Sequence, residues 1–164
     1  MSNVGVRNST IEVVRVRAGG REHSDLVGLI TEYVTTWAGK REPTGAVEWE
    51  ILNELTRVPT PYLAAWVTYI DGTAAGCVLA VEGPAGMIEL SRLFVRPEYR
   101  RRGVARSLVA RLVDWVGSRS AVYLFVQTKR KPAISLYRKF GFMECVVAPR
   151  EKFTEMVRGG TPAE

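Results

Sequence analysis

Cysteine and histidine are nearly absent from this chain, which has two cysteines and one histidine among 164 residues. Cys77 and Cys145 are too few for a disulfide framework, and with His23 alone they do not suggest a zinc site. No apolar run approaches the ~18 residues of a membrane-spanning helix. Residues 1–7 lack the apolar core of a signal peptide. The sequence therefore predicts a cytoplasmic protein with reduced cysteines, no metal and no membrane partner.

Hydrophobic residues make up 46% of the chain and charged residues 24%, which is ordinary for a globular protein and excludes a disordered, collagen-like or coiled-coil chain. The length fits one domain of ~150 residues. We expect a polar tail over residues 1–10, a single domain over 11–158 and a second tail over 159–164.

Positive charge is concentrated in one block. The whole chain has a net charge of +6, but residues 92–139 contain 13 basic and only two acidic residues, a net of +11. The remaining residues therefore carry a net of −5. Such a block favours a polyanionic partner, whereas the acidic remainder is either a surface for a cation or an ordinary solvated surface.

Hydrophobic periodicity predicts alternating strands and helices. Ser24 is the expected N-cap of the first helix, and Asp71-Gly72 has the composition of a hairpin turn. The pattern predicts an α/β fold: a mixed β-sheet of about six to seven strands, flanked on both faces by about four helices. The expected strands are 11–16, 62–70, 73–81, 87–95, 121–126, 142–147 and 153–157, and the expected helices are 25–37, 46–57, 103–115 and 133–140.

The most informative segment is residues 93–105, where an apolar strand ends, Pro97 interrupts it and an arginine-rich loop leads into a helix. The first N–H groups of a helix have no internal partner and favour an anion. Gly103 allows close approach of a ligand to the backbone. An anion site is therefore predicted here, although a solvated connection between strand and helix is the plain alternative.

The order Arg100-x-x-Gly103-x-Ala105 resembles the acetyl-coenzyme A signature of the GNAT acetyltransferase superfamily. The run from Ala133 through Leu136-Tyr137 to Gly141-Phe142 is similar to the second hallmark of that family. The resemblance covers residues 11–147 and is most specific over 89–142. It implies a GNAT-like fold and transfer of an acetyl group from acetyl-CoA, as co-substrate, to a primary amine.

The resemblance also implies how acetyl-CoA is held. Its pyrophosphate would lie on the loop amides and its pantetheine arm along the fourth strand of the fold, and the basic block suits its roughly four negative charges. Arg130 stands where many members have an asparagine, so it is expected either to reach a phosphate or to make no contact. The residues implied in binding are Leu93, Phe94, Val95, Arg100, Arg101, Arg102, Gly103, Val104, Ala105, Arg106, Arg130 and Tyr137.

Two residues are candidates for catalysis. Tyr137 matches the general acid of the family, and a phenol stays protonated at neutral pH. Glu89 is the candidate base, because its apolar neighbours would raise its pKa. Strand alternation would place Glu89, Ser91, Leu93 and Val95 on one face, so that base and cofactor share a cleft. The alternative for Tyr137 is a tyrosine of the core. The alternatives for Glu89 are a surface glutamate and a structural partner of Arg92.

The acceptor is predicted less sharply. Trp37 lies near a loop that forms one wall of the acceptor site in the family. Glu48 belongs to an acidic group with Glu42, Glu50 and Glu54. This acidic group favours a small cationic or amino-acid-like amine, or a protein lysine or N-terminus, as the acceptor. A solvated helix face explains the same acidic residues. Three other hypotheses stay open: another short acyl-CoA as the donor, a module that binds acetyl-CoA without catalysis, and nucleic-acid binding through the basic block. The last is disfavoured because aromatic residues are not interleaved with the basic residues. A homodimer is the default expectation.

Overall fold

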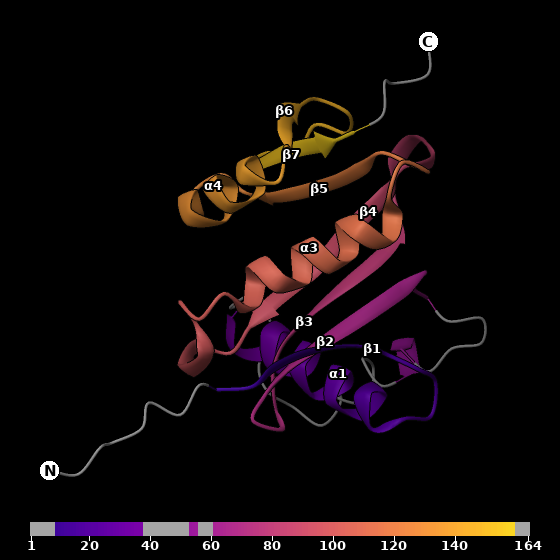
Figure 1. Cartoon of the computed structure of the whole chain (residues 1–164). Helices are drawn as coiled ribbons and strands as arrows, with labels where there is room; N and C mark the ends of the chain where they lie inside the picture. The colour runs from indigo at the N-terminus through magenta and orange to yellow at the C-terminus, as the bar shows by residue number, and fades with distance from the viewer. Residues whose placement is uncertain (1–8, 38–52, 56–60, 160–164) are drawn as a thin grey trace, which may run out of the picture.

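The computed structural model of the chain describes residues 9–37, 53–55 and 61–159 (Figure 1). Seven strands form one mixed sheet in the order β1-β2-β3-β4-β5-β7-β6. All its pairs are antiparallel except β4 with β5. The elements are β1 Ile11–Arg15, α1 Arg21–Glu32, the π-helical turn η1 Tyr33–Trp37, β2 Ala64–Ile70, β3 Thr73–Glu82, β4 Ile88–Val95, α3 Val104–Val116, β5 Val122–Gln127, α4 Lys131–Lys139, β6 Met143–Cys145 and β7 Phe153–Arg158.

Helices cover both faces of the sheet, which confirms the predicted α/β architecture. One apolar cluster joins α3 and α4 to the sheet through buried residues such as Leu108, Leu112 and Ile134; we call this side the α3 face. The other cluster joins α1 to the sheet through Leu26 and Leu29; we call this side the α1 face. Figure 1 shows α3 lying across the middle strands, with β5, β7 and β6 beyond it.

The first helix starts earlier than predicted. Gly20 is its N-cap, and Ser24 lies inside the first turns, so the prediction of Ser24 as the cap is wrong. The Gly20 N–H donates to the Arg17 carbonyl at 3.1 Å, and Gly19 has a φ of 78°. This tight turn reverses the chain and starts the helix at Arg21. Of the second predicted helix, 46–57, residues 53–55 are helical and the others lie outside the described residues.

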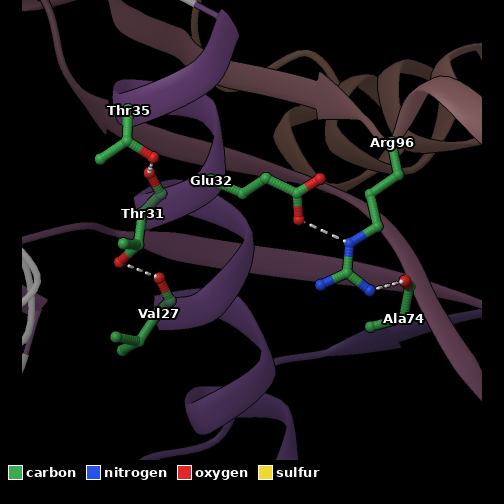
Figure 2. Close-up of polar contacts among 6 residues, drawn as sticks. All are labelled: Val27, Thr31, Glu32, Thr35, Ala74 and Arg96. Atoms are coloured by element: carbon green, nitrogen blue, oxygen red, sulfur yellow. Dashed lines mark hydrogen bonds and ion pairs between the residues drawn. The ribbon is translucent and has the colours of Figure 1, made fainter. Parts of the chain in front are cut away.

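The end of α1 widens into the π-helical turn η1. The Thr31 hydroxyl donates to the Val27 carbonyl at 2.8 Å, and the Thr35 hydroxyl donates to the Thr31 carbonyl at 2.8 Å (Figure 2). Hydroxyls that compete for helix carbonyls in this way often bend a helix, and single π turns are frequent at functional sites. The ring of Tyr33, the first residue of η1, lies 5.6 Å from that of Phe94 on β4.

The remaining predicted strands are present, and their ends differ from the predicted ones by at most two residues. The hairpin at Asp71-Gly72 joins β2 and β3 as expected, and the last predicted strands are the short β6 and the longer β7. Within the part of the chain that the structure describes, no helix is long and apolar enough to cross a bilayer.

Candidate active site

A deep cleft opens where β4 and β5 separate. These parallel strands are paired only at Ile88 with Val122 and at Glu89 with Tyr123, and then diverge. The gap is a cavity of about 920 Å³. Its lining comes from both sides of the sheet, so it passes from one face to the other. The lining residues are Tyr33, Val34, Glu54, Glu89, Leu90, Ser91, Arg92, Leu93, Phe94, Val95, Arg100, Ala105, Leu124, Phe125, Val126, Gln127, Arg130, Pro132, Ala133, Leu136, Tyr137 and Phe153.

A β-bulge at Arg92 shifts the alternation of β4. Leu79 of β3 lies opposite Ser91, but Cys77 lies opposite Phe94, so one extra residue fits between these pairs. Arg92 has a φ of 51°, a conformation uncommon for a residue with a side chain. Such a bulge changes which side chains share a face.

The expectation that Glu89, Ser91, Leu93 and Val95 share one face is therefore wrong. Glu89 lies opposite Val81, whose side chain packs on the α1 face, whereas Leu93 and Val95 pack against the α3 face. The carboxylate and the two apolar side chains still meet in one cleft, because the cleft passes through the sheet.

The backbone of Val95 is directed into this cleft. Arg96 N–H donates to the Ala75 carbonyl at 2.8 Å, and Val95 lies opposite Gly76. In an antiparallel ladder this pattern makes Gly76 and Val95 a pair without direct hydrogen bonds. The N–H and C=O of Val95 therefore turn away from β3 and toward the gap beside β5.

Glu89 lies on the α1 face of the cleft, half-buried. Burial raises the pKa of its carboxyl above the ordinary value, and the positive charge of Arg150 opposes this shift. A raised pKa makes a carboxylate a better proton acceptor from an ammonium group. The group is thus suited to act as a base.

A buried carboxylate fixes the wall next to Glu89. Glu155 of β7 accepts hydrogen bonds from the Tyr123 hydroxyl at 2.7 Å, from Ala148 N–H at 2.7 Å and from Val147 N–H at 3.2 Å. Although burial alone would raise the pKa of Glu155, these bonds and Arg150 lower it overall. The same hydrogen bonding adds to burial in raising the pKa of Tyr123 to about 12. These bonds attach the loop before β7 to β5.

Tyr137 lies on the α3 face, opposite in the sheet to Glu89. It is 6% exposed, and its ring contacts that of Phe142 with centroids 5.8 Å apart. Burial raises its pKa, the nearby Tyr33 phenol raises it further, and Arg130 opposes both. The hydroxyl therefore remains protonated at neutral pH and is available as a donor.

The amino end of α3 forms the basic end of the cleft. Gly103 is its N-cap with a φ of 78°, and no atom lies within 4 Å of where a Cβ would be. Arg100 and Arg130 line the cleft here, and burial together with the charge of Arg130 lowers the pKa of Arg100. Two guanidinium groups this close repel each other, and a bound anion relieves that repulsion.

The family of the chain follows from its sequence. A model described as "Acetyltransferase (GNAT) family" matches residues 27–142. The chain belongs to the GNAT acetyltransferase family. The resemblance seen in the two hallmarks is thereby confirmed.

The chain is also similar to known proteins over part of their length. The chain is 41% identical over 76 residues to an uncharacterized protein of Mycobacterium leprae, with 46% of this chain and 21% of that protein covered. It is 31% identical over 96 residues to an IAA acetyltransferase of Azospirillum brasilense, with 57% of this chain and 63% of that protein covered. The chain thus spans less than two thirds of the length of these relatives.

The fold is also that of solved GNAT structures. An N-acetyltransferase of Thermoplasma acidophilum, determined in complex with coenzyme A, superposes with a TM-score of 0.67 at 20% identity. That comparison covers 92% of this chain and 99% of the other. At this identity the likeness concerns the fold alone.

Within this GNAT chain the cleft brings together most of the predicted site. Of the described residues predicted to act there, Trp37, Arg101, Arg102, Gly103, Val104 and Arg106 do not line the cleft, and Glu48 lies outside the described residues. Arg101 and Arg102 are exposed, and Val104 is buried in the core beneath the loop. The predicted residues that line it are Glu89, Leu93, Phe94, Val95, Arg100, Ala105, Arg130 and Tyr137.

Sequence reasoning missed several residues of the cleft. Tyr33 comes from the π turn, which no local pattern marks, and Phe125 and Phe153 come from β5 and β7, outside both hallmarks. The sequence offers Arg92 as part of the basic block and as a partner of Glu89, whereas the structure places it in the lining of the cleft. Strand pairing places Arg92, Phe125 and Phe153, and the π turn places Tyr33, so local sequence marks none of these positions.

Proposed function

We propose that this chain transfers an acetyl group from acetyl-CoA to the primary amine of a small cationic or amino-acid-like acceptor, or of a protein lysine or N-terminus. One observation carries the proposal: Glu89 and Tyr137 line a single through-sheet cleft from opposite faces. A base at one mouth and an acid at the other match a direct transfer, in which the amine enters from one side and the thiol leaves on the other.

The steps balance with these two groups. Glu89 accepts the proton of the acceptor ammonium, directly or through a water, and the amine nitrogen attacks the thioester carbon. The Val95 N–H, directed into the cleft, donates to the oxyanion that forms. The carbon–sulfur bond then breaks, and the Tyr137 hydroxyl supplies the proton that converts the leaving thiolate to a thiol. Arg130, which opposes the raised pKa of Tyr137, eases that donation. The nitrogen of the new amide gives its extra proton to the Tyr137 phenolate, which restores the acid, and Glu89 releases the first proton to solvent.

The basic end of the cleft suits the phosphates of acetyl-CoA. Arg100 and Arg130 line it, and the open amino end of α3 follows directly after Gly103. Arginine pairs with phosphate through two parallel hydrogen bonds, and unpaired helix N–H groups add to this. Arg101, Arg102 and Arg106 are exposed around this end and contribute long-range attraction. A different short acyl group on the same CoA is the alternative donor.

The first test is release of CoA-thiol from acetyl-CoA with spermidine, free amino acids, aminoglycosides and a lysine peptide. Tyr137→Phe is the matched variant, because it keeps the ring contact with Phe142 and removes only the hydroxyl. We expect release with one amine class and a lower kcat for the variant at unchanged melting temperature. Tyr62→Phe, which removes a hydroxyl from the other core, should leave kcat unchanged.

The second candidate is a module that binds acetyl-CoA without catalysis. It is favoured if no acyl-CoA of short chain supports thiol release with any of these amines while acetyl-CoA still raises the melting temperature. Two further predictions of the sequence, a cytoplasmic location and a homodimer, are tested by localising the tagged chain and by analytical ultracentrifugation.

A further inference from the structure

The α1-face mouth of the cleft carries charges of both signs. Glu54, Glu89 and Arg92 line it. The guanidinium carbon of Arg150 lies 4.2 Å from the ring centroid of Phe125, which is also part of the lining. Two carboxylates and two guanidinium groups thus surround the place where the acceptor amine must approach Glu89.

Arg92 reaches this mouth because of the β-bulge. A regular strand would direct the side chains of Ser91 and Arg92 to opposite faces. With the extra residue, Arg92 lies toward the α1 face, where its guanidinium is 4.0 Å from the Glu54 carboxylate. Its positive charge also reaches the Cys77 thiol, which is buried on that face.

This arginine lies on the wrong side of the sheet to bind the phosphates of CoA. The basic end with Arg100 and Arg130 lies at α3 and α4, on the α3 face. Arg92 is on the α1 face, it lines the cleft, and 31% of its side chain is exposed. Its contact with Glu54 is at the outer limit of an ion pair, and a guanidinium has five N–H donors for additional acceptors.

We propose that Arg92 binds a carboxylate of the acceptor while Glu89 receives its amine, so that the acceptor is an amine that also carries a carboxylate. The inference rests on the proposed transferase function. A planar guanidinium binds a carboxylate through two parallel hydrogen bonds, which fixes the direction of the ligand as well as its position. Arg150 adds positive charge on the same side.

The test compares amines that differ only in the carboxylate. L-phenylalanine, L-methionine, β-alanine and 4-aminobutyrate are each paired with the corresponding carboxamide. The amine of a carboxamide loses its proton more readily, so the chemical bias favours the amide. We nevertheless expect kcat/KM to be at least about tenfold higher for one of the free acids than for its amide.

Arg92→Gln should abolish this difference by raising KM for the acid, with little change in KM for the amide or for acetyl-CoA. Arg92→Lys, which keeps the charge without the planar fork, should recover part of the preference. Arg17→Gln removes the same charge at an exposed position after β1 and should leave the preference intact. Amides that react as well as their acids, or an Arg92→Gln variant that keeps the full preference, would overturn the inference.

A binding measurement separates this inference from the proposed function. Calorimetry of the CoA-loaded protein with the same pairs reports recognition without chemistry. Tighter binding of an acid than of its amide, lost in Arg92→Gln, supports the inference even if no thiol is ever released, in which case the transferase function fails. Thiol release with equal binding of both pair members supports the function and overturns the inference.

Discussion

The Nε of Arg96 donates to the Glu32 carboxylate at 2.9 Å, joining the last residue of α1 to the residue that follows β4 (Figure 2). A second donor of the same guanidinium binds the Ala74 carbonyl at 2.8 Å. One arginine therefore ties α1 to both β3 and β4. Since η1 and Tyr33 follow Glu32 directly, this contact sets the position of the α1-face wall of the cleft relative to the end of β4.

Removing this ion pair should lower stability in a graded way. Glu32→Ala removes the pair, and because both side chains are about a quarter to a third exposed we expect a loss of about 1 kcal/mol in the free energy of unfolding. Arg96→Ala also leaves the Ala74 carbonyl without this donor and should cost about 2 kcal/mol. Urea denaturation measures both.

The control for this series is Glu144→Ala, which removes a more exposed pair with Arg138. Surface pairs of this kind contribute little, so its effect should stay below about 0.5 kcal/mol. Equal losses of unfolding free energy in Glu32→Ala and Glu144→Ala would show that the Glu32–Arg96 pair stabilises the fold no more than an exposed pair does.

Glu89→Gln should lower kcat by about 100-fold or more, because general-base catalysis contributes that much and the amide cannot accept the proton. KM for acetyl-CoA should be unchanged, since the proposed phosphate site is at the other end of the cleft. Glu82→Gln, an exposed glutamate on the neighbouring strand, is the matched control and should keep wild-type kcat. A Glu89→Gln variant with wild-type turnover would remove Glu89 from the mechanism.

The pH profile gives an independent check on the same carboxyl. The base must be ionised, so kcat/KM should rise with pH through a pKa above the ordinary ~4.3 of glutamate, since burial raises the pKa of Glu89. Arg150→Gln removes the charge that opposes the shift, and the rising limb should then move to higher pH. The limb should not move in Arg17→Gln. A limb that moves to lower pH in Arg150→Gln would contradict the assignment of this pKa to Glu89.

The sequence was sufficient for the regular elements and for the α3 end of the site. The strands around Asp71-Gly72 and the motif from Arg100 to Ala105 depend on local composition, and each appears where local rules place it. The face of Glu89 could not be predicted, because the bulge at Arg92 has no glycine or asparagine to mark it. The pairing of β4 with β3 fixes both the bulge and the face on which Glu89 lies.

The residues on the α1 face of the cleft also could not be predicted from local sequence. Phe153 and Arg150 reach the cleft only because β7 inserts between β5 and β6, an order that does not follow the chain. Tyr33 depends on a π turn, and the threonine hydroxyls that bond to the backbone there leave no mark in the spacing of apolar residues along the sequence. Residues that meet through such long-range pairing leave no signal in spacing.

Glu155→Gln should destabilise the β5–β7 wall. The carboxylate accepts three hydrogen bonds, two of them from backbone N–H groups, and an amide would turn a donor toward one of these donors. We expect a loss of about 2 kcal/mol or more in the free energy of unfolding at pH 7. Glu151→Gln, exposed in the same loop, should have almost no effect.

The loss caused by Glu155→Gln should depend on pH. Because the pKa of Glu155 is lower in the folded than in the unfolded chain, its charge stabilises the fold above the unfolded value of ~4.3. That contribution disappears as the pH falls through the folded pKa. The difference between wild type and variant should therefore shrink on acidification, and a constant difference from pH 7 to pH 3 would contradict this account.

Gly76→Ala should damage the fold and the cleft together. A Cβ at this position would lie 2.7 Å from the Phe94 carbonyl oxygen and 3.0 Å from a methyl of Val104, so β4 and α3 would have to move apart. Overpacking of this kind costs about 1–3 kcal/mol.

Because the displaced atoms belong to the strand that directs the Val95 N–H into the cleft, Gly76→Ala should also lower kcat/KM for acetyl-CoA more than its lower melting temperature explains. The control is Gly28→Ala in α1, where a Cβ meets no atom within 4 Å and helix propensity predicts a gain of up to ~1 kcal/mol. If Gly76→Ala kept wild-type kcat/KM at a temperature where it is fully folded, the close approach of β3 to β4 would be a matter of packing alone.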